Sequence, residues 1–443
     1  VHDTVGDRDA SKISYEASLT DMQNLLDRAP GPYIKDSAYR TLGASMISLG
    51  RVGEAAEYYD ELIADTKEVQ EQATFRMLLT ELLFENQDFD RAKENAQALL
   101  ELDFEDDNQA GYYRKERAYS IIGNALLQER RYEDAASVFS KGLRDYPNSG
   151  ESANMAFSQA FAEFNAQDFP ASAKNFKKYV KKYQDDRNAV HGQYYLAHSH
   201  QALTQFSTAA EEFSSLVEKF PKSLYEEEAL YLIGENYYNE QDFAKAAKAY
   251  LVLLKRYFGD YSDEAQYALA WAYFEQEEME EGVLAMEELV RSHPDSEYAS
   301  KAQFTIGDFY YNVRNYERAR DAYAHLTEHY SSSEEAPKAR RLIGELSEIQ
   351  ASLEYGEIMK LFENKQYPDA VEGFKAIISK YPGTYTELAA YCNMGLSFEI
   401  MREWSKAVEN YDALLEKGGE EAQNADVVGF AKLHRDWIVD NRL

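Results

Sequence analysis

The sequence predicts an all-α solenoid built from about ten helix-turn-helix repeats. Two observations support this fold class. A column of mostly small residues recurs along the chain, and an alanine column and an aromatic column follow it in the same register. Glycine and proline are also sparse, at 22 and 9 in 443 residues, which suits a chain that is largely helical.

The first helix of each repeat is predicted around the small-residue column. Its members lie mainly 37 residues apart, with longer gaps of 43 and 51, and they are Gly43, Thr80, Gly123, Ala160, Ala197, Gly234, Ala270, Gly307, Ile358 and Gly395. A Gly or Ala at the centre of a helix lets a neighbouring helix approach closely. We therefore expect the second helix of each repeat to pack against this point.

The second helix carries an alanine column and, four residues later, an aromatic column. The first column is Ala55, Ala92, Ala135, Ser172, Ala209, Ala246, Gly282, Ala319, Ala370 and Ala407, and the second is Tyr59, Ala96, Phe139, Phe176, Phe213, Tyr250, Met286, Tyr323, Phe374 and Tyr411. Positions four apart share one face of a helix. We expect the rings to fill the space beside the small residues, and the repeats to stack because neither helix could bury this face alone.

Turns and insertions complete the predicted organisation. Pro147, Pro221, Pro294 and Pro382 each follow a second helix, and a Ser or Thr two residues later could cap the next first helix. The two long gaps predict insertions, near residues 105–111 and at an added helix. The predicted domains are 1–36, a degenerate or truncated repeat; 37–335, repeats one to eight; 336–351, the inserted helix; 352–423, repeats nine and ten; and 424–443, a capping helix.

These columns resemble those of the tetratricopeptide (TPR) repeats over roughly residues 37–420, although the unit is longer than the usual repeat of about 34 residues. Thr80 and Ile358 depart from the small-residue pattern. The longer unit, with stretches such as "YPNS" and "ALYLIGENYY", resembles the bacterial cell-envelope subset of outer-membrane assembly lipoproteins and Tol-Pal accessory proteins. This resemblance implies a right-handed superhelix and a periplasmic or envelope-associated adaptor, with a cytoplasmic location as the alternative.

In a TPR-like superhelix the first helices line a concave groove. The residues expected to point into it are Phe157, Phe161, Phe164, Asn165, Tyr194, Tyr231, Glu235, Tyr238, Asn239, Tyr267, Trp271, Phe274, Phe304, Asp308, Tyr311 and Asn312. Aromatic rings, amides and carboxylates suit a protein partner that offers a basic or extended segment. The alternative is that the rings pack between neighbouring first helices.

The charge of the chain limits its partners. Lys and Arg number 47 against 79 Asp and Glu, and the net charge of −32 repels nucleic acids and anionic lipid surfaces. We expect no nucleic-acid partner. The sequence contains no glycine-rich loop of the kind that binds phosphate groups, so we also expect no cofactor. No apolar run is long enough to span a bilayer, although an N-terminal anchor removed from the chain could attach it to a membrane.

One basic feature opposes this acidity. Lys174, Lys177, Lys178, Lys181 and Lys182 follow helical spacing and form a stripe on a predicted second helix. The stripe is either a solvated helix face or a docking surface for an acidic partner or anionic headgroups.

The stretch "HLTEH", residues 325–329, matches the H-x-x-E-H pattern of some zinc hydrolases. Leu326 falls in an apolar column, so we expect His325 and His329 at solvated positions of a repeat helix. The predicted function is therefore a non-catalytic protein scaffold or adaptor. The alternatives are a structural subunit of a large machine that uses the convex face and edges, and a zinc-dependent hydrolase.

Overall fold

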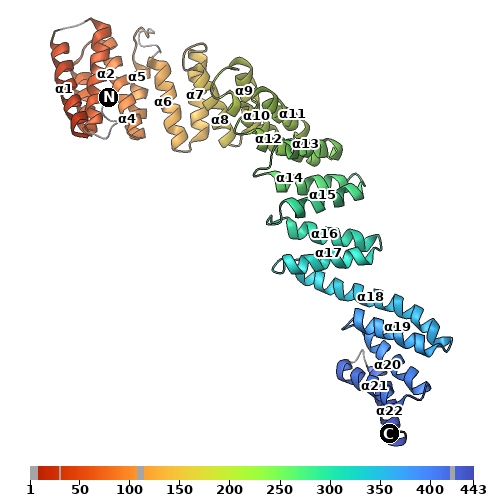
Figure 1. Ribbon diagram of the computed structural model, residues 1–443. Helices are drawn as coiled ribbons and strands as arrows, with labels where there is room; N and C mark the ends of the chain where they lie inside the picture. Colours follow the sequence, from red (N-terminus) through yellow and green to blue (C-terminus); the bar gives the residue numbers. More distant parts are fainter. Residues whose placement is uncertain (1–7, 29–30, 107–113, 420–424) are drawn as a thin grey trace. The chain divides into compact units, whose positions relative to one another are not determined.

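The computed structural model describes residues 8–28, 31–106, 114–419 and 425–443, and within these ranges every regular element is an α-helix (Figure 1). The helices are α1 Arg8–Asp27, α2 Pro32–Ser48, α3 Val52–Asp65, α4 Val69–Glu85, α5 Phe89–Glu101, α6 Arg114–Gln128, α7 Tyr132–Asp145, α8 Ser152–Asn165, α9 Phe169–Lys182, α10 Ala189–Ala202, α11 Phe206–Lys219, α12 Glu226–Asn239, α13 Phe243–Arg256, α14 Ser262–Phe274, α15 Met279–Ser292, α16 Ala299–Asn312, α17 Tyr316–His329, α18 Ala336–Glu363, α19 Tyr367–Lys380, α20 Tyr385–Ile400, α21 Trp404–Gly418 and α22 Ala425–Asn441. From α2 onward the helices alternate as the first and second helices of successive repeats. This is the predicted all-α solenoid of TPR-like repeats.

The chain divides into two compact units, Val1–Ala249 and Tyr250–Leu443, and the division falls within α13. In the N-terminal unit, consecutive helices pack pairwise, and first helices also contact first helices, as in α4 with α6 and α6 with α8. In the C-terminal unit α18 contacts α20 in the same way. First helices therefore pack mainly on second helices, and several of them also contact the first helix of the next repeat, so that their outer sides lie on the same face of the repeats.

The core of each repeat confirms the small, alanine and aromatic columns. Ala135 and Phe139 of α7 are completely buried, and the ring of Phe139 lies directly over Gly123 of α6. A Cβ atom built on Gly123 would lie 2.5 Å from Phe139 Cε1, which is shorter than real carbon contacts. The glycine is therefore needed for this close approach, as the sequence pattern predicts.

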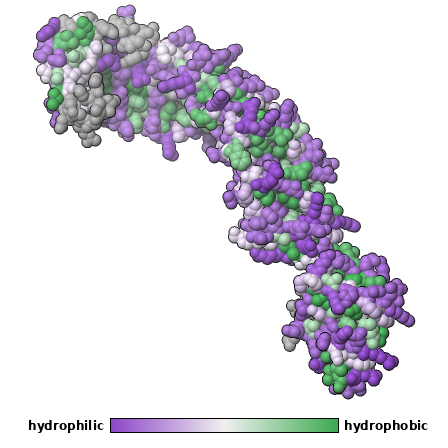
Figure 2. All heavy atoms as spheres, viewed as in Figure 1, coloured by the Kyte–Doolittle hydropathy of each residue, from purple (hydrophilic) through white to green (hydrophobic). Residues whose placement is uncertain are grey.

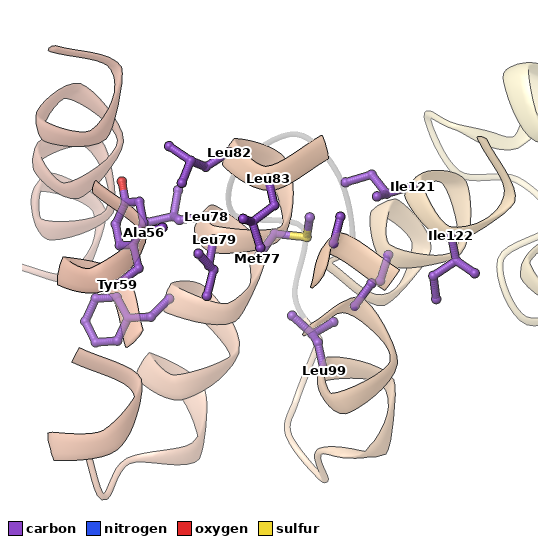
Figure 3. Close-up of a cluster of buried hydrophobic side chains, with 14 of the residues drawn as sticks. Ala56, Tyr59, Met77, Leu78, Leu79, Leu82, Leu83, Leu99, Ile121 and Ile122 are labelled. Atoms are coloured by element: carbon purple, nitrogen blue, oxygen red, sulfur yellow. The ribbon is translucent and has the colours of Figure 1, made fainter. Parts of the chain in front are cut away.

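Neighbouring repeats share one continuous core. Figure 3 shows side chains of α4, among them Leu79 and Leu83, lying between Tyr59 of α3 on one side and Leu99 of α5 and Ile121 of α6 on the other. Burial of such large apolar side chains stabilises the fold by about 1.5–3 kcal/mol each. Each helix is thus held by the repeats before and after it.

Every turn between the two helices of a repeat contains one residue with a left-handed backbone. The φ angles are positive at Gly50, Gln87, Arg130, Gln167, Thr204, Gln241, Glu277, Arg314, Lys365 and Arg402. The N–H of the next residue then donates to a carbonyl five residues back, as Asp88 does to Leu83 at 2.9 Å. This arrangement closes the end of the first helix.

The predicted serine and threonine caps are confirmed at one position and wrong at the other three. Thr384 caps α20, because its hydroxyl accepts a hydrogen bond from the Glu387 N–H at 3.0 Å. Ser149 and Ser296 lie three residues before α8 and α16, and they donate instead to carboxylates of the preceding repeat, Ser296 to Asp263 at 2.6 Å. Ser223 lies three residues before α12, and the residue at the N-cap of that helix is Tyr225, which makes no side-chain cap. An extra turn between the proline and the helix separates these serines from the helix start.

The longer of the two insertions lies inside a helix. Residues 336–363 form the single 28-residue helix α18, so the domain boundary predicted at 351 lies within it. Residues 107–111 of the other insertion, and residues 1–7 and 420–424 of the predicted terminal regions, lie outside the described residues. Helix α22 packs on α20 and α21 at the position predicted for the capping helix.

Candidate partner-binding surfaces

In the N-terminal unit, the aromatic residues of α8 join neighbouring helices. Phe157 packs on Phe176 of α9 with a ring-centroid distance of 5.7 Å. Phe161 and Phe164 pack on Tyr195 of α10 at 5.2 and 5.1 Å. All three remain half-buried, so each ring holds the repeats together and still leaves an edge accessible on the first-helix face.

Tyr194 of α10 is anchored at both ends of its side chain. Its ring stacks on Tyr225 at 4.1 Å, and its hydroxyl donates to Glu228 of α12 at 2.9 Å. Burial and the Glu228 carboxylate together raise the pKa of Tyr194. Burial also lowers the pKa of the neighbouring His198, against the opposing charge of Glu228.

An open hollow of about 430 Å³ lies between α8 and α10 on this face. Phe164, Asn165, Phe169 and His198 contribute to its walls. The amide nitrogen of Asn165 donates to the Phe161 carbonyl of its own helix at 2.8 Å. This bond uses one of the two N–H donors of the amide, so contact of Asn165 with a partner's backbone stays a prediction.

On α12, the predicted groove residues Tyr231, Glu235 and Tyr238 are half-buried, and Asn239 is exposed at the end of the helix. Tyr238 packs on Phe243 of α13 with a ring-centroid distance of 5.1 Å. The first-helix face of the N-terminal unit thus continues from α8 through α10 to α12.

In the C-terminal unit, α14 presents a ridge of three aromatic residues. Tyr267 stacks on Tyr298 at 4.9 Å, and Phe274 covers Gly282 of α15. Trp271 lies between them, with ring-centroid distances of 6.1 Å to Tyr267 and 5.5 Å to Phe274. Trp271 is exposed, at 37%, whereas the other predicted groove aromatics are half-buried.

The predicted residues of α16 are mostly engaged within the repeat. Phe304 packs on Tyr323 at 5.5 Å, and Asp308 accepts a hydrogen bond from the buried Tyr323 hydroxyl at 2.5 Å. Tyr311 packs on Tyr316 at 6.0 Å, while Asn312 is exposed. Asp308 therefore supports the core and also fixes a negative charge on the first-helix face.

Two tyrosines that sequence reasoning missed join this face. Tyr225 and Tyr298 are the residues just before α12 and α16, and each stacks on a tyrosine of the preceding first helix. Burial and Glu264, which accepts a hydrogen bond from its hydroxyl, raise the pKa of Tyr298 to about 12. The signal in the sequence is a tyrosine in the same place before three successive first helices, at Tyr225, Tyr261 and Tyr298, outside the columns used for the prediction.

The five lysines of the predicted basic stripe all lie exposed on α9. Within the described part of the chain, none of them forms an ion pair, in contrast to Lys93, Lys245 and Lys360. Lys182 donates to the Pro147 carbonyl at 2.8 Å, which holds the end of α9 against the preceding turn. The structure therefore brings the five lysines together on one outward face.

The H-x-x-E-H stretch lies in the second half of α17. His325 and His329 contribute to a cavity of about 970 Å³ among α15, α16 and α17, and Glu328 is not part of its wall. In the described ranges, no three His, Cys, Asp or Glu side chains are grouped so that they could hold a metal ion. The zinc-hydrolase arrangement needs the glutamate beside the metal, and this helix turns Glu328 away from the two histidines.

Across the residues that the structure describes, no helix combines the length and the apolar character needed to cross a bilayer. Figure 2 agrees with this, since hydrophilic residues predominate on the face shown and apolar residues are scattered among them.

Similar structures have been solved for several bacterial proteins. They include the C-terminal part of a TPR repeat-containing protein from Cytophaga hutchinsonii, with 12% identity, 59% of this chain and 98% of that chain covered, and a TM-score of 0.43. A TPR protein from Parabacteroides merdae has 12% identity, coverage of 64% and 100%, and a TM-score of 0.34. MamA from Desulfovibrio magneticus RS-1 has 17% identity, coverage of 42% and 98%, and a TM-score of 0.33.

Among curated proteins, none matches this chain significantly. The family YfiO, described as outer membrane lipoprotein, matches residues 113–231 and 226–407. These two matches together cover more than half of the 443 residues, and they include most of the repeats described above. The chain therefore belongs to the YfiO family of outer membrane lipoproteins.

Proposed function

We propose that this protein is a non-catalytic scaffold of the bacterial cell envelope, which binds a segment of a partner protein along the first-helix face. The family supports the location, because its members are described as outer membrane lipoproteins. The repeat architecture supports the scaffold role, because stacked helix pairs give an extended surface suited to holding another chain.

The observation that carries the proposal is the aromatic ridge of α14. Trp271 leaves 37% of its surface in water although two aromatic neighbours flank it. Large aromatic residues in such settings are frequent hot spots of protein interfaces, because they offer a rigid apolar area. A partner side chain placed against Trp271 would also contact the accessible edges of Tyr267 and Phe274.

The charge of the same face favours a basic segment. Glu264 accepts a hydrogen bond from Tyr298, and Asp308 accepts one from Tyr323, so both carboxylates have fixed positions in the C-terminal unit. In the N-terminal unit Glu228 is fixed by Tyr194 in the same way. Positioned negative charges beside aromatic rings can attract Lys or Arg by charge and by cation–π contact.

Replacement of Trp271 by Ala tests this proposal. The native partner would first be identified by cross-linking in envelope preparations, and its affinity for purified variants would then be measured by calorimetry. We expect Trp271→Ala to weaken binding by about 2 kcal/mol or more, with an unchanged circular dichroism spectrum.

Leu284→Ala is the control, since Leu284 is also an exposed apolar residue, at 63%, but lies on the second helix α15. It should leave the affinity unchanged. Equal partner affinities for the wild type and Trp271→Ala would refute binding on the first-helix face. They would favour the alternative, a structural subunit that binds its neighbours through the second-helix side.

The proposed location has its own test. The full-length protein, expressed from its native gene with an epitope tag, should sediment with outer membranes and leave them in detergent. Recovery in the cytosolic fraction would contradict the envelope location without affecting the groove.

A further inference from the structure

Beyond its first two residues, the exposed side of α9 consists of lysine alone. From residue 171 to residue 183, each exposed position is a lysine: Lys174, Lys177, Lys178, Lys181 and Lys182. The remaining residues of this stretch, among them Phe176 and Tyr179, are buried or half-buried against the repeat core. Helix α9 contains no acidic residue, although the chain as a whole has a net charge of −32.

These charges are not neutralised within the protein. Elsewhere the chain pairs exposed lysines with a carboxylate three residues earlier, as in Asp242 with Lys245, Glu357 with Lys360 and Glu372 with Lys375. No described carboxylate lies within ion-pair distance of the five lysines of α9. Like charges three and four residues apart on a helix repel each other, so this face destabilises α9.

The charged face is one helix wide. The second helices before and after α9 in the chain present exposed acids, Glu133 and Asp134 on α7 and Glu211 and Glu218 on α11. A flat anionic membrane would face these acids as well as the lysines, because screening extends over only about 8 Å at physiological salt. A single acidic helix or extended peptide segment is narrow enough to contact the lysines without lying against these acidic residues.

The length of the lysine stripe suits such a peptide segment. Lys174 and Lys182 are eight residues apart, which corresponds to about 12 Å along the helix. An acidic helix of two to three turns, or an extended acidic segment of the same length, could pair with all five lysines at once. Lysine side chains are flexible enough to adjust to carboxylates at different positions along it.

We propose that α9 is a second docking surface, separate from the first-helix face, and that it binds an acidic segment of a protein partner. The lysine face is a local concentration of unpaired positive charge in a chain whose net charge is −32. Binding depends on charge pairing, so it weakens as salt concentration rises.

A labelled oligoglutamate peptide is a direct probe of this surface. Fluorescence anisotropy should show salt-dependent binding to the wild-type protein. The triple variant Lys174→Gln, Lys177→Gln and Lys181→Gln should bind about tenfold or more weakly. Its thermal midpoint should be equal to or above that of the wild type, because removal of repelling charges does not harm the fold.

The matched control is Lys245→Gln, Lys360→Gln and Lys375→Gln, which removes the same number of charges from lysines that are already paired. This variant should keep wild-type affinity for oligoglutamate. Trp271→Ala should keep it as well, and that result would show that the lysine surface binds independently of the first-helix face.

Three results would overturn the proposal. The first is no binding of oligoglutamate to the wild-type protein. The second is an equal loss in both triple variants, which would indicate an effect of net charge alone. The third is lysine-dependent binding to phosphatidylglycerol vesicles without binding to oligoglutamate, which would make the surface a membrane contact.

Discussion

At Gly123, the space that a side chain would take is filled by the ring of Phe139. The same arrangement places Tyr411 over Gly395, where a Cβ atom would lie 2.6 Å from Tyr411 Cε1. Where the first helix carries alanine, as at Ala160 and Ala197, the column is also completely buried. The side-chain volume at this position therefore sets how closely the two helices of a repeat approach.

Gly123→Ala should destabilise the protein by about 1–3 kcal/mol, because the added methyl group would overlap the Phe139 ring. The shift in the urea unfolding midpoint measures this. Gly344→Ala is the matched control, since Gly344 lies exposed in α18 with open space around it. It should stabilise the helix by about 0.5–1 kcal/mol, and destabilisation of similar size in both variants would contradict the packing argument.

At the same scale, the candidate groove was only partly predictable. The sequence places Asp308 and Asn165 on the groove side of their helices, but it does not show that Tyr323 and the Phe161 carbonyl already engage them. The Tyr323–Asp308 bond joins two helices, so it depends on how closely they pack. The Asn165 bond lies within α8 and depends on the side-chain conformation of Asn165. Trp271 could be placed from its register, whereas its exposure depends on the rings beside it.

At the scale of the element, the turn inside each repeat combines a regular geometry with an irregular sequence. Gly50 is the glycine expected for a left-handed backbone, yet nine other turns place a side chain there. A β-branched residue is the least suited to this conformation, which makes Thr204, with φ of 55°, the most strained of the set.

Thr204→Gly should therefore stabilise the N-terminal unit by about 1 kcal/mol, because glycine adopts a left-handed backbone without a steric penalty. Thermal and urea midpoints measure the gain. Thr204→Ala, which removes only the branching, should give a smaller gain. A loss of stability with glycine would show that the Thr204 side chain contributes more than its backbone costs.

Helix boundaries were predictable where the columns repeat and not where they are interrupted. The gap of 51 residues between Gly307 and Ile358 indicates an insertion, but not that it continues directly into the next first helix. No proline or glycine pair interrupts residues 338–363, and the Ser347 hydroxyl donates back to the Ile343 carbonyl of the same helix, so helix formation continues through the predicted boundary. The prediction of serine caps was wrong for a different reason. An extra turn lies between each of these serines and the following helix, and this turn has no recognisable pattern in the sequence.

At the scale of the whole molecule, the net charge of −32 is the dominant electrostatic property. Mutual repulsion of excess carboxylates destabilises a folded chain more than an expanded one. Most of the ion pairs are exposed, so they contribute little against this repulsion.

An increase in salt should therefore raise the thermal midpoint. Between about 0.05 and 0.5 M salt the screening length falls from about 14 to about 4 Å, which removes most long-range repulsion. Sodium chloride and choline chloride should give the same rise if charge screening is the cause. A midpoint that falls with salt would mean that the ion pairs outweigh the repulsion.

The long helix α18 shows how the array tolerates an insertion. Relative to the usual spacing, this repeat gains about fourteen residues, which is close to four full helical turns. Because each residue turns the helix by about 100°, the added length returns the apolar stripe to within about 40° of its original direction. Ile358 consequently still meets the second helix of its repeat, where it packs over Gly373 with the sizes exchanged, large on the first helix and small on the second. Angular phase, rather than length, is what an inserted segment must preserve for the repeats beyond it to continue stacking.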